Sequence, residues 1–67
     1  MELIVNNKPE KLQAGDKLCE LLAQLSLADK RGIAVAVNNA VIARGNWNSY
    51  QLNDNDKITI IRPTQGG

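Results

Sequence analysis

One stripe of leucines limits the folds that are open to this short chain. Leu18, Leu21, Leu22 and Leu25 recur at i, i+3, i+4 and i+7, a spacing that places them on one face of an α-helix. Burying each leucine fully is worth roughly 1.5–3 kcal/mol, whereas an isolated helix of about two turns is marginal in water. The helix therefore needs a sheet to cover its stripe. Asp16 stands just before it and is predicted to cap its first turn.

Segments on both sides of the helix alternate between apolar and polar residues with the period of two that is typical of strands. The expected strands are residues 2–6, 10–13, 33–37, 40–43 and 57–62. In the third of these the large side chains of Ile33, Val35 and Val37 share one face, and only Ala34 and Ala36 occupy the other. Pro63 ends the last strand because it has no N–H to donate.

Turn residues separate these strands. Residues 6–9, 38–39 and 54–56 are rich in asparagine and aspartate, which tolerate the left-handed backbone of tight turns. Residues 26–32 are predicted to form a loop with Leu27 turned inward, and residues 44–51 to be irregular or a single helical turn.

The resulting order is strand, strand, helix, strand, short strand, strand. One amphipathic helix can cover one face of one mixed sheet, which gives a two-layer α+β domain. The first strand can lie parallel to the last only through a crossover, and the helix provides it. We therefore predict a β-grasp, or ubiquitin-like, fold with four to five strands. Residues 1–67 are expected to form a single domain with a flexible tail at 63–67.

Composition excludes several classes of function. The chain of 67 residues has one cysteine and no histidine, so neither an intrachain disulfide nor a zinc site is expected. Its charge of +1 is spread along the sequence, which argues against nucleic-acid binding. No apolar stretch approaches the ~20 residues that span a bilayer. We expect a cytoplasmic protein that binds neither membrane nor nucleic acid and has no catalytic residue, metal or bound cofactor of its own.

The terminal Gly66-Gly67 is the feature that indicates chemistry. A terminal glycine presents its carboxylate with no Cβ beside it, and a second glycine frees the preceding backbone. The five residues beyond Arg62, when fully extended, cover about 17 Å. Such a tail, with Thr64 and Gln65 before the glycines, can enter a narrow channel and offer its carboxylate there. Gly67 is therefore the predicted reactive position.

Several motifs along the chain together resemble the sulfur carriers of thiamine biosynthesis, which are small ubiquitin-like proteins. The matching residues are Leu3-Ile4-Val5-Asn6, Gly15 with Glu20-Leu21-Leu22 and Leu25, Val35-Ala36-Val37-Asn38 with Val41, Arg44 and Trp47, Leu52 with Asp54-Asn55-Asp56, and Gly66-Gly67. Asn55 replaces a glycine common in that family, and Gln65 stands where a small or apolar residue is frequent. The first departure concerns the turn at residues 54–56, and the second concerns the finer contacts with partners.

The resemblance implies a carrier cycle centred on Gly67. An adenylating enzyme that uses ATP and Mg²⁺, similar to those that activate ubiquitin, would convert the Gly67 carboxylate to an acyl-adenylate. A cysteine-derived persulfide would displace AMP and leave a thiocarboxylate, whose sulfur passes to thiazole synthase. Gly66, Gln65 and Thr64 would thread the tail into these partners, and catalysis would belong to the partners.

A docking surface is predicted on the sheet face that the helix does not cover. Ile4, Thr59 and Ile61 should lie there around the small Ala34 and Ala36. Arg62 is expected to bind a partner as well.

Three other side chains are given structural roles. Arg44 is expected to be solvated, and Trp47 to plug a satellite core beneath the irregular segment. Cys19 is expected to be a packing residue or partly exposed and inert, since a reactive thiol would want a basic neighbour or a histidine.

Three alternatives remain open from the sequence. The small subunit of molybdopterin synthase is similar and ends in the same diglycine, although Arg44, Trp47 and the short chain favour the thiamine carrier. A ubiquitin-like modifier would use Gly67 to join lysines of other proteins. A pure interaction module would not need the tail at all.

Overall fold

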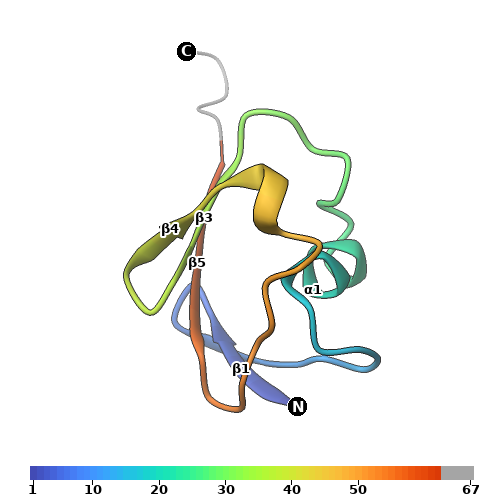
Figure 1. Ribbon diagram of the computed structural model, residues 1–67. Coiled ribbons are helices and arrows are strands. Elements are labelled where there is room, and N and C mark those ends of the chain that lie inside the picture. Colours follow the sequence, from blue (N-terminus) through green and yellow to red (C-terminus); the bar gives the residue numbers. More distant parts are fainter. Residues whose placement is uncertain (63–67) are drawn as a thin grey trace.

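A mixed sheet covered on one face by a single α-helix forms the fold in the computed structural model, which describes residues 1–62 (Figure 1). The elements are β1 (Glu2–Val5), β2 (Lys8–Lys11), α1 (Leu18–Gln24), β3 (Ala34–Val37), β4 (Ala40–Ile42), a 3₁₀ turn η1 (Arg44–Asn46) and β5 (Lys57–Ile61). The strand order is β2-β1-β5-β3-β4. β1 lies parallel to β5, and the other neighbouring strands are antiparallel. This confirms the predicted β-grasp arrangement, with β5 at the centre of the sheet.

Two asparagine pairs close the two hairpins of the sheet. Asn6 and Asn7 have φ angles of 50° and 68°, and Asn38 and Asn39 have 51° and 72°, as a two-residue hairpin turn requires. The predicted turn over residues 6–9 is therefore too long. The return strand begins at Lys8, opposite Val5, and its proline is tolerated because β2 is an edge strand.

The predicted Asp16 cap of α1 is wrong. The Oε1 atom of Glu20 accepts hydrogen bonds from the backbone N–H groups of Lys17 and Asp16, at 3.1 and 3.2 Å. These bonds satisfy donors at the helix start from within the first turn. Gly15 makes this possible: it has a φ of +83°, and a Cβ at this position would overlap the Glu20 carboxylate.

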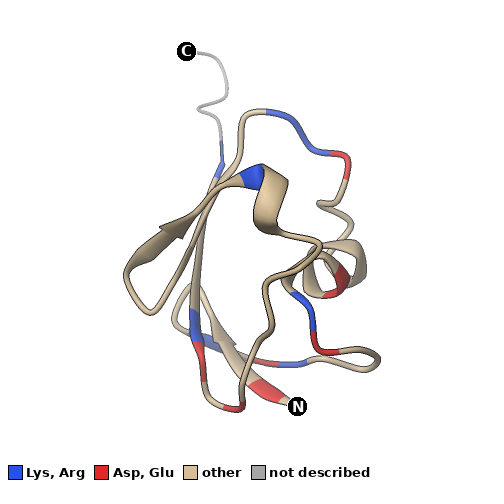
Figure 2. Ribbon diagram, viewed as in Figure 1, with Lys and Arg blue, Asp and Glu red and all other residues tan. Residues whose placement is uncertain are grey.

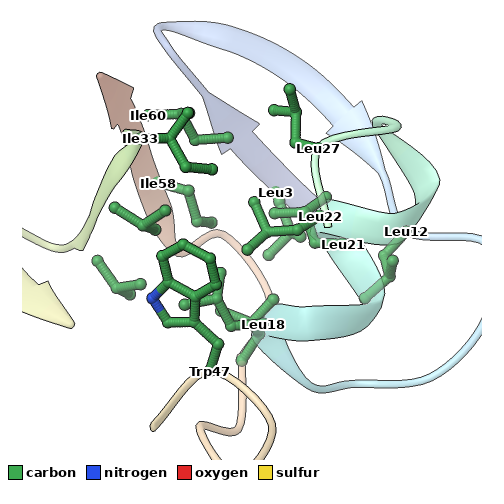
Figure 3. Close-up of a cluster of buried hydrophobic side chains, with 13 residues drawn as sticks. Leu3, Leu12, Leu18, Leu21, Leu22, Leu27, Ile33, Trp47, Ile58 and Ile60 are labelled. Atoms are coloured by element: carbon green, nitrogen blue, oxygen red, sulfur yellow. The ribbon is translucent and has the colours of Figure 1, made fainter. Parts of the chain in front are cut away.

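The leucine stripe packs into a continuous core between α1 and the sheet (Figure 3). Leu18, Leu21 and Leu22 are fully buried, and Leu25 is half-buried where the helix ends. The buried residues are Leu3, Leu12, Leu18, Leu21, Leu22, Leu27, Ile33, Val35, Val37, Trp47, Leu52, Ile58 and Ile60. Trp47 belongs to this main core, not to a satellite, and its Nε1 donates to the Ile42 carbonyl at 2.9 Å.

Candidate functional site

The sheet face opposite α1 carries the side chains predicted to dock partners. Alternation along β5 turns Ile58 and Ile60 into the core, so Thr59 and Ile61 point to the other face. The register pairs Ala34 with Ile61 and Ala36 with Thr59.

Ile4 lies on the same open face, one strand away. It is half-buried, between the core residue Leu3 and Val5. Ile4, Thr59 and Ile61 therefore share the open face with the two alanines, as predicted.

Val41 enlarges this surface, and the sequence analysis missed it. It lies opposite Ala36 in the β3–β4 pair and is 77% exposed, while Ile61 is 60% exposed. A two-residue turn at Asn38-Asn39 fixes this register, so the turn length was the signal that could have placed Val41. We call Ile4, Ala34, Ala36, Val41, Thr59 and Ile61 the open-face patch.

The open-face patch is suited to recognition. Val41 and Ile61 are the exposed large hydrophobic residues within 1–62, and both belong to it. Clustered exposed apolar side chains mark interaction sites more often than scattered ones do. Its six side chains include no ionisable or metal-binding group, and residues 1–62 contain no cluster of three metal-ligating side chains. The patch can therefore hold a partner by contact.

Arg62 and Arg44 differ in their surroundings. Arg62 is exposed and directly follows Ile61 at the end of β5. The prediction that Arg44 is simply solvated is wrong: its Nη2 donates to the Lys30 carbonyl at 2.7 Å. Its guanidinium carbon also lies 4.5 Å from the centre of the Trp47 ring. The 3₁₀ turn places the Arg44 guanidinium over the Trp47 ring, because residues three apart are superposed along such a helix.

Cys19 lines a shallow pocket beside this arginine. The pocket has a volume of about 220 Å³, and Trp47 and Arg44 contribute to its wall. The cysteine is half-buried and packs against the core, in agreement with the packing role expected for it.

The predicted tail residues Thr64, Gln65, Gly66 and Gly67 lie outside the described residues. Their roles in threading and sulfur attachment therefore stay predictions. Within residues 1–62, α1 is far too short to span a bilayer, and no other helix qualifies as a membrane span.

Known proteins match the chain along its whole length. The ThiS family model matches residues 2–67. The sulfur carrier protein ThiS of Escherichia coli is 32% identical over 69 residues, which cover all of both chains. A thiazole synthase of Magnetococcus marinus is 33% identical over 67 residues, but the chain spans only 20% of that longer protein.

Solved structures of thiamine biosynthesis proteins also match the chain. The crystal structure of the thiamine biosynthesis protein ThiS from Geobacter metallireducens has a TM-score of 0.81 and 28% identity, with full coverage of both chains. The solution structure of a thiamine biosynthesis protein from the same organism has a TM-score of 0.78 and 28% identity, covering this chain fully and 88% of the other. The family model also includes Gly66 and Gly67. The chain therefore belongs to the ThiS family of thiamine-biosynthesis sulfur carriers.

Proposed function

We propose that the chain carries sulfur as a thiocarboxylate on Gly67 and delivers it to thiazole synthase. The observation that carries this proposal is the family match, which runs through the core and on to the terminal Gly67. A carboxylate at the end of a glycine pair is also the reactive group that the chain can best present to another enzyme. The cytoplasm is the proposed location of this cycle.

The proposed chemistry takes place in the active sites of partners. A carboxylate is a poor electrophile, so an adenylating enzyme first joins Gly67 to the AMP part of ATP and releases pyrophosphate. The terminal sulfur of a cysteine-derived persulfide then attacks the acyl carbon, and AMP leaves. A second thiol cleaves the resulting acyl disulfide and frees the thiocarboxylate. ATP and Mg²⁺ belong to the adenylating enzyme, and the chain itself needs no bound cofactor.

The open-face patch is proposed to position the tail for these steps. Ile4, Thr59 and Ile61 would contact the partner, and Arg62 would pair with its acidic groups. The patch includes the end of β5, from which the chain continues to Gly67. The reach of about 17 Å beyond Arg62 then sets how deep the partner's reacting groups can lie. Thr64, Gln65 and Gly66 would occupy the channel between the patch and those groups.

The thiazole branch is favoured over molybdopterin synthesis by the relative from Magnetococcus marinus. The chain matches one fifth of a protein named thiazole synthase, so a carrier-like segment and a synthase share one polypeptide there. Physical linkage of this kind raises the effective concentration of two modules that work together. The protein modifier and the interaction module are the alternatives that the following experiment separates from the carrier.

The test is the intact mass of the chain after incubation with ATP, magnesium, cysteine and an extract of its host. We expect a gain equal to the exchange of one oxygen for sulfur, which a chain lacking Gly66 and Gly67 should not show. An extract verified on a known carrier is the positive control. If that control gains sulfur and this chain does not, the carrier proposal is wrong. Attachment to larger proteins would instead establish a modifier.

A further inference from the structure

The basic residues of this chain are unevenly placed in space. Four of the eight lie at one end of the molecule (Figure 2). Lys30 and Arg31 are in the loop before β3, Arg44 begins η1, and Arg62 follows β5. We call these four residues the basic rim.

The acidic residues lie mostly elsewhere. Of seven in the chain, Asp29 alone lies beside the rim. The other six are on β1, β2, the start of α1 and the turn before β5. The rim end therefore has four cations against one carboxylate, and the rest of the chain has four against six.

Contacts between the loops hold the rim together. The Nη2 atom of Arg44 donates to the Lys30 carbonyl at 2.7 Å, which joins η1 to the loop. Stacking on the buried Trp47 ring, at 4.5 Å, fixes the same guanidinium. A charge held in place in the free protein loses less side-chain entropy on binding than a mobile one does.

The rim also borders the end of β5. Arg31 and Arg44 line a shallow groove of about 430 Å³ together with Asp29. Ile61 in β5 pairs with Ala34 in the antiparallel strand β3. Arg62 follows Ile61 and therefore leaves the sheet beside the segment that carries Lys30 and Arg31.

We infer that the basic rim docks on an acidic protein surface around the channel of the adenylating enzyme. This rests on the proposed function, because a tail inserted to Gly67 brings Arg62 within about 17 Å of the reacting carboxylate. The enzyme surface at its channel mouth must then face the rim. All four rim residues are exposed and come from three separate segments, an arrangement that suits an extended acidic surface. A phosphate site would instead require donors that converge on one point.

The rim should act mainly on association, since complementary charges steer encounter. The test compares two variants that each lose two positive charges. One is Lys30→Gln with Arg31→Gln, and the other is Lys8→Gln with Lys11→Gln on the exposed edge strand β2. Neither pair of side chains makes a hydrogen bond or ion pair within residues 1–62. Unfolding curves should show that both variants fold as the unaltered chain does.

Pyrophosphate release by the host's adenylating enzyme gives kcat/KM for each chain. The rim variant is expected to lose roughly tenfold at about 0.1 M salt, within the range that electrostatic steering spans. The β2 variant is expected to lose less than about twofold. The difference should shrink at about 1 M salt, where the Debye length falls from about 10 Å to about 3 Å. The KM for ATP should be the same for all three chains.

Equal losses in the two variants would overturn the inference, and so would a difference that persists at high salt. A raised KM for ATP with the carrier's kcat/KM unchanged would assign the rim to a phosphate group instead. If the unaltered chain is active and both variants have the same kcat/KM as it does, the carrier function stands and only the docking role of the basic rim is wrong. No pyrophosphate release with the unaltered chain, from an enzyme active on a known carrier, would reject the proposed function itself.

Discussion

Ile61→Asp should separate docking from folding, because Ile61 is 60% exposed in the free protein. Folding buries only the remaining two fifths of its surface. Since full burial of an isoleucine is worth roughly 1.5–3 kcal/mol, this part is worth about 1 kcal/mol. The lower strand propensity of aspartate adds at most about 1 kcal/mol. The free energy of unfolding should therefore fall by about 1–2 kcal/mol, and the domain should remain folded.

Docking should suffer far more from the same change. A partner that covers Ile61 would bury the rest of its surface, worth about 1–2 kcal/mol. A carboxylate there would instead be buried without a hydrogen-bond partner, at a cost of about 1–3 kcal/mol or more. Together these effects amount to about 3 kcal/mol, which is about a hundredfold in Kd.

Urea unfolding and calorimetric titration with the adenylating enzyme measure the two effects of Ile61→Asp. Two matched variants serve as controls. Ile60→Asp changes the neighbouring core residue, which is 6% exposed, and should prevent stable folding. Ala23→Asp adds the same charge on the exposed side of α1 and should leave the Kd within about twofold. If Ile61→Asp lowers stability as severely as Ile60→Asp, Ile61 is a core residue and its assignment to the open face is wrong. If Ile61→Asp leaves the Kd unchanged, the open-face patch does not dock the enzyme.

Three further changes probe the tail, the core and the helix start. Deleting Gly66 and Gly67 should leave the free energy of unfolding within about 0.5 kcal/mol, as measured in urea, while abolishing sulfur loading; a larger loss would mean that the tail packs on its own domain. Leu21→Ala should lower stability by about 2–5 kcal/mol, because it leaves a cavity at a fully buried position; a loss under 1 kcal/mol in urea would show that the core collapses around it. Glu20→Ala should cost about 1 kcal/mol and Asp16→Ala less than 0.5 kcal/mol, since only the former caps backbone N–H groups; the reverse order in thermal unfolding would restore Asp16 as the cap.

The fold could be predicted because its determinants are local in the sequence. The leucine stripe gives the helix and its buried face, and the alternation of residues 57–61 gives the central strand. The cap at α1 was predicted wrongly for a physical reason. Aspartate is a good N-cap in isolation, but the N–H groups of Leu18 and Cys19, from which an Asp16 cap would accept, donate to the carbonyls of Tyr50 and Trp47 at 2.9 and 3.0 Å. These carbonyls belong to a distant segment of the chain, so nothing in the sequence around residue 16 reveals them.

The candidate site was predicted in part because strand alternation, like the leucine stripe, is local in the sequence. Strand alternation placed Thr59 and Ile61 on the open face without any knowledge of partners. Val41 was missed because its face depends on the length of the preceding turn, and that turn was not used to set the register. Arg44 was misjudged because its partners are a backbone carbonyl in another loop and the ring of Trp47. Contacts between separate segments of this kind leave no periodic signal in a sequence.

Sulfur delivery to thiazole synthase tests the proposed carrier function most directly. The chain would be loaded with heavy-isotope sulfur through the adenylating enzyme, purified, and mixed with thiazole synthase and its other substrates. Mass spectrometry of the thiazole product and of the recovered chain would follow the label. We expect labelled thiazole and a Gly67 carboxylate restored in equal amount. Thiazole formed without the label, while the thiocarboxylate remains intact, would contradict the proposed carrier function.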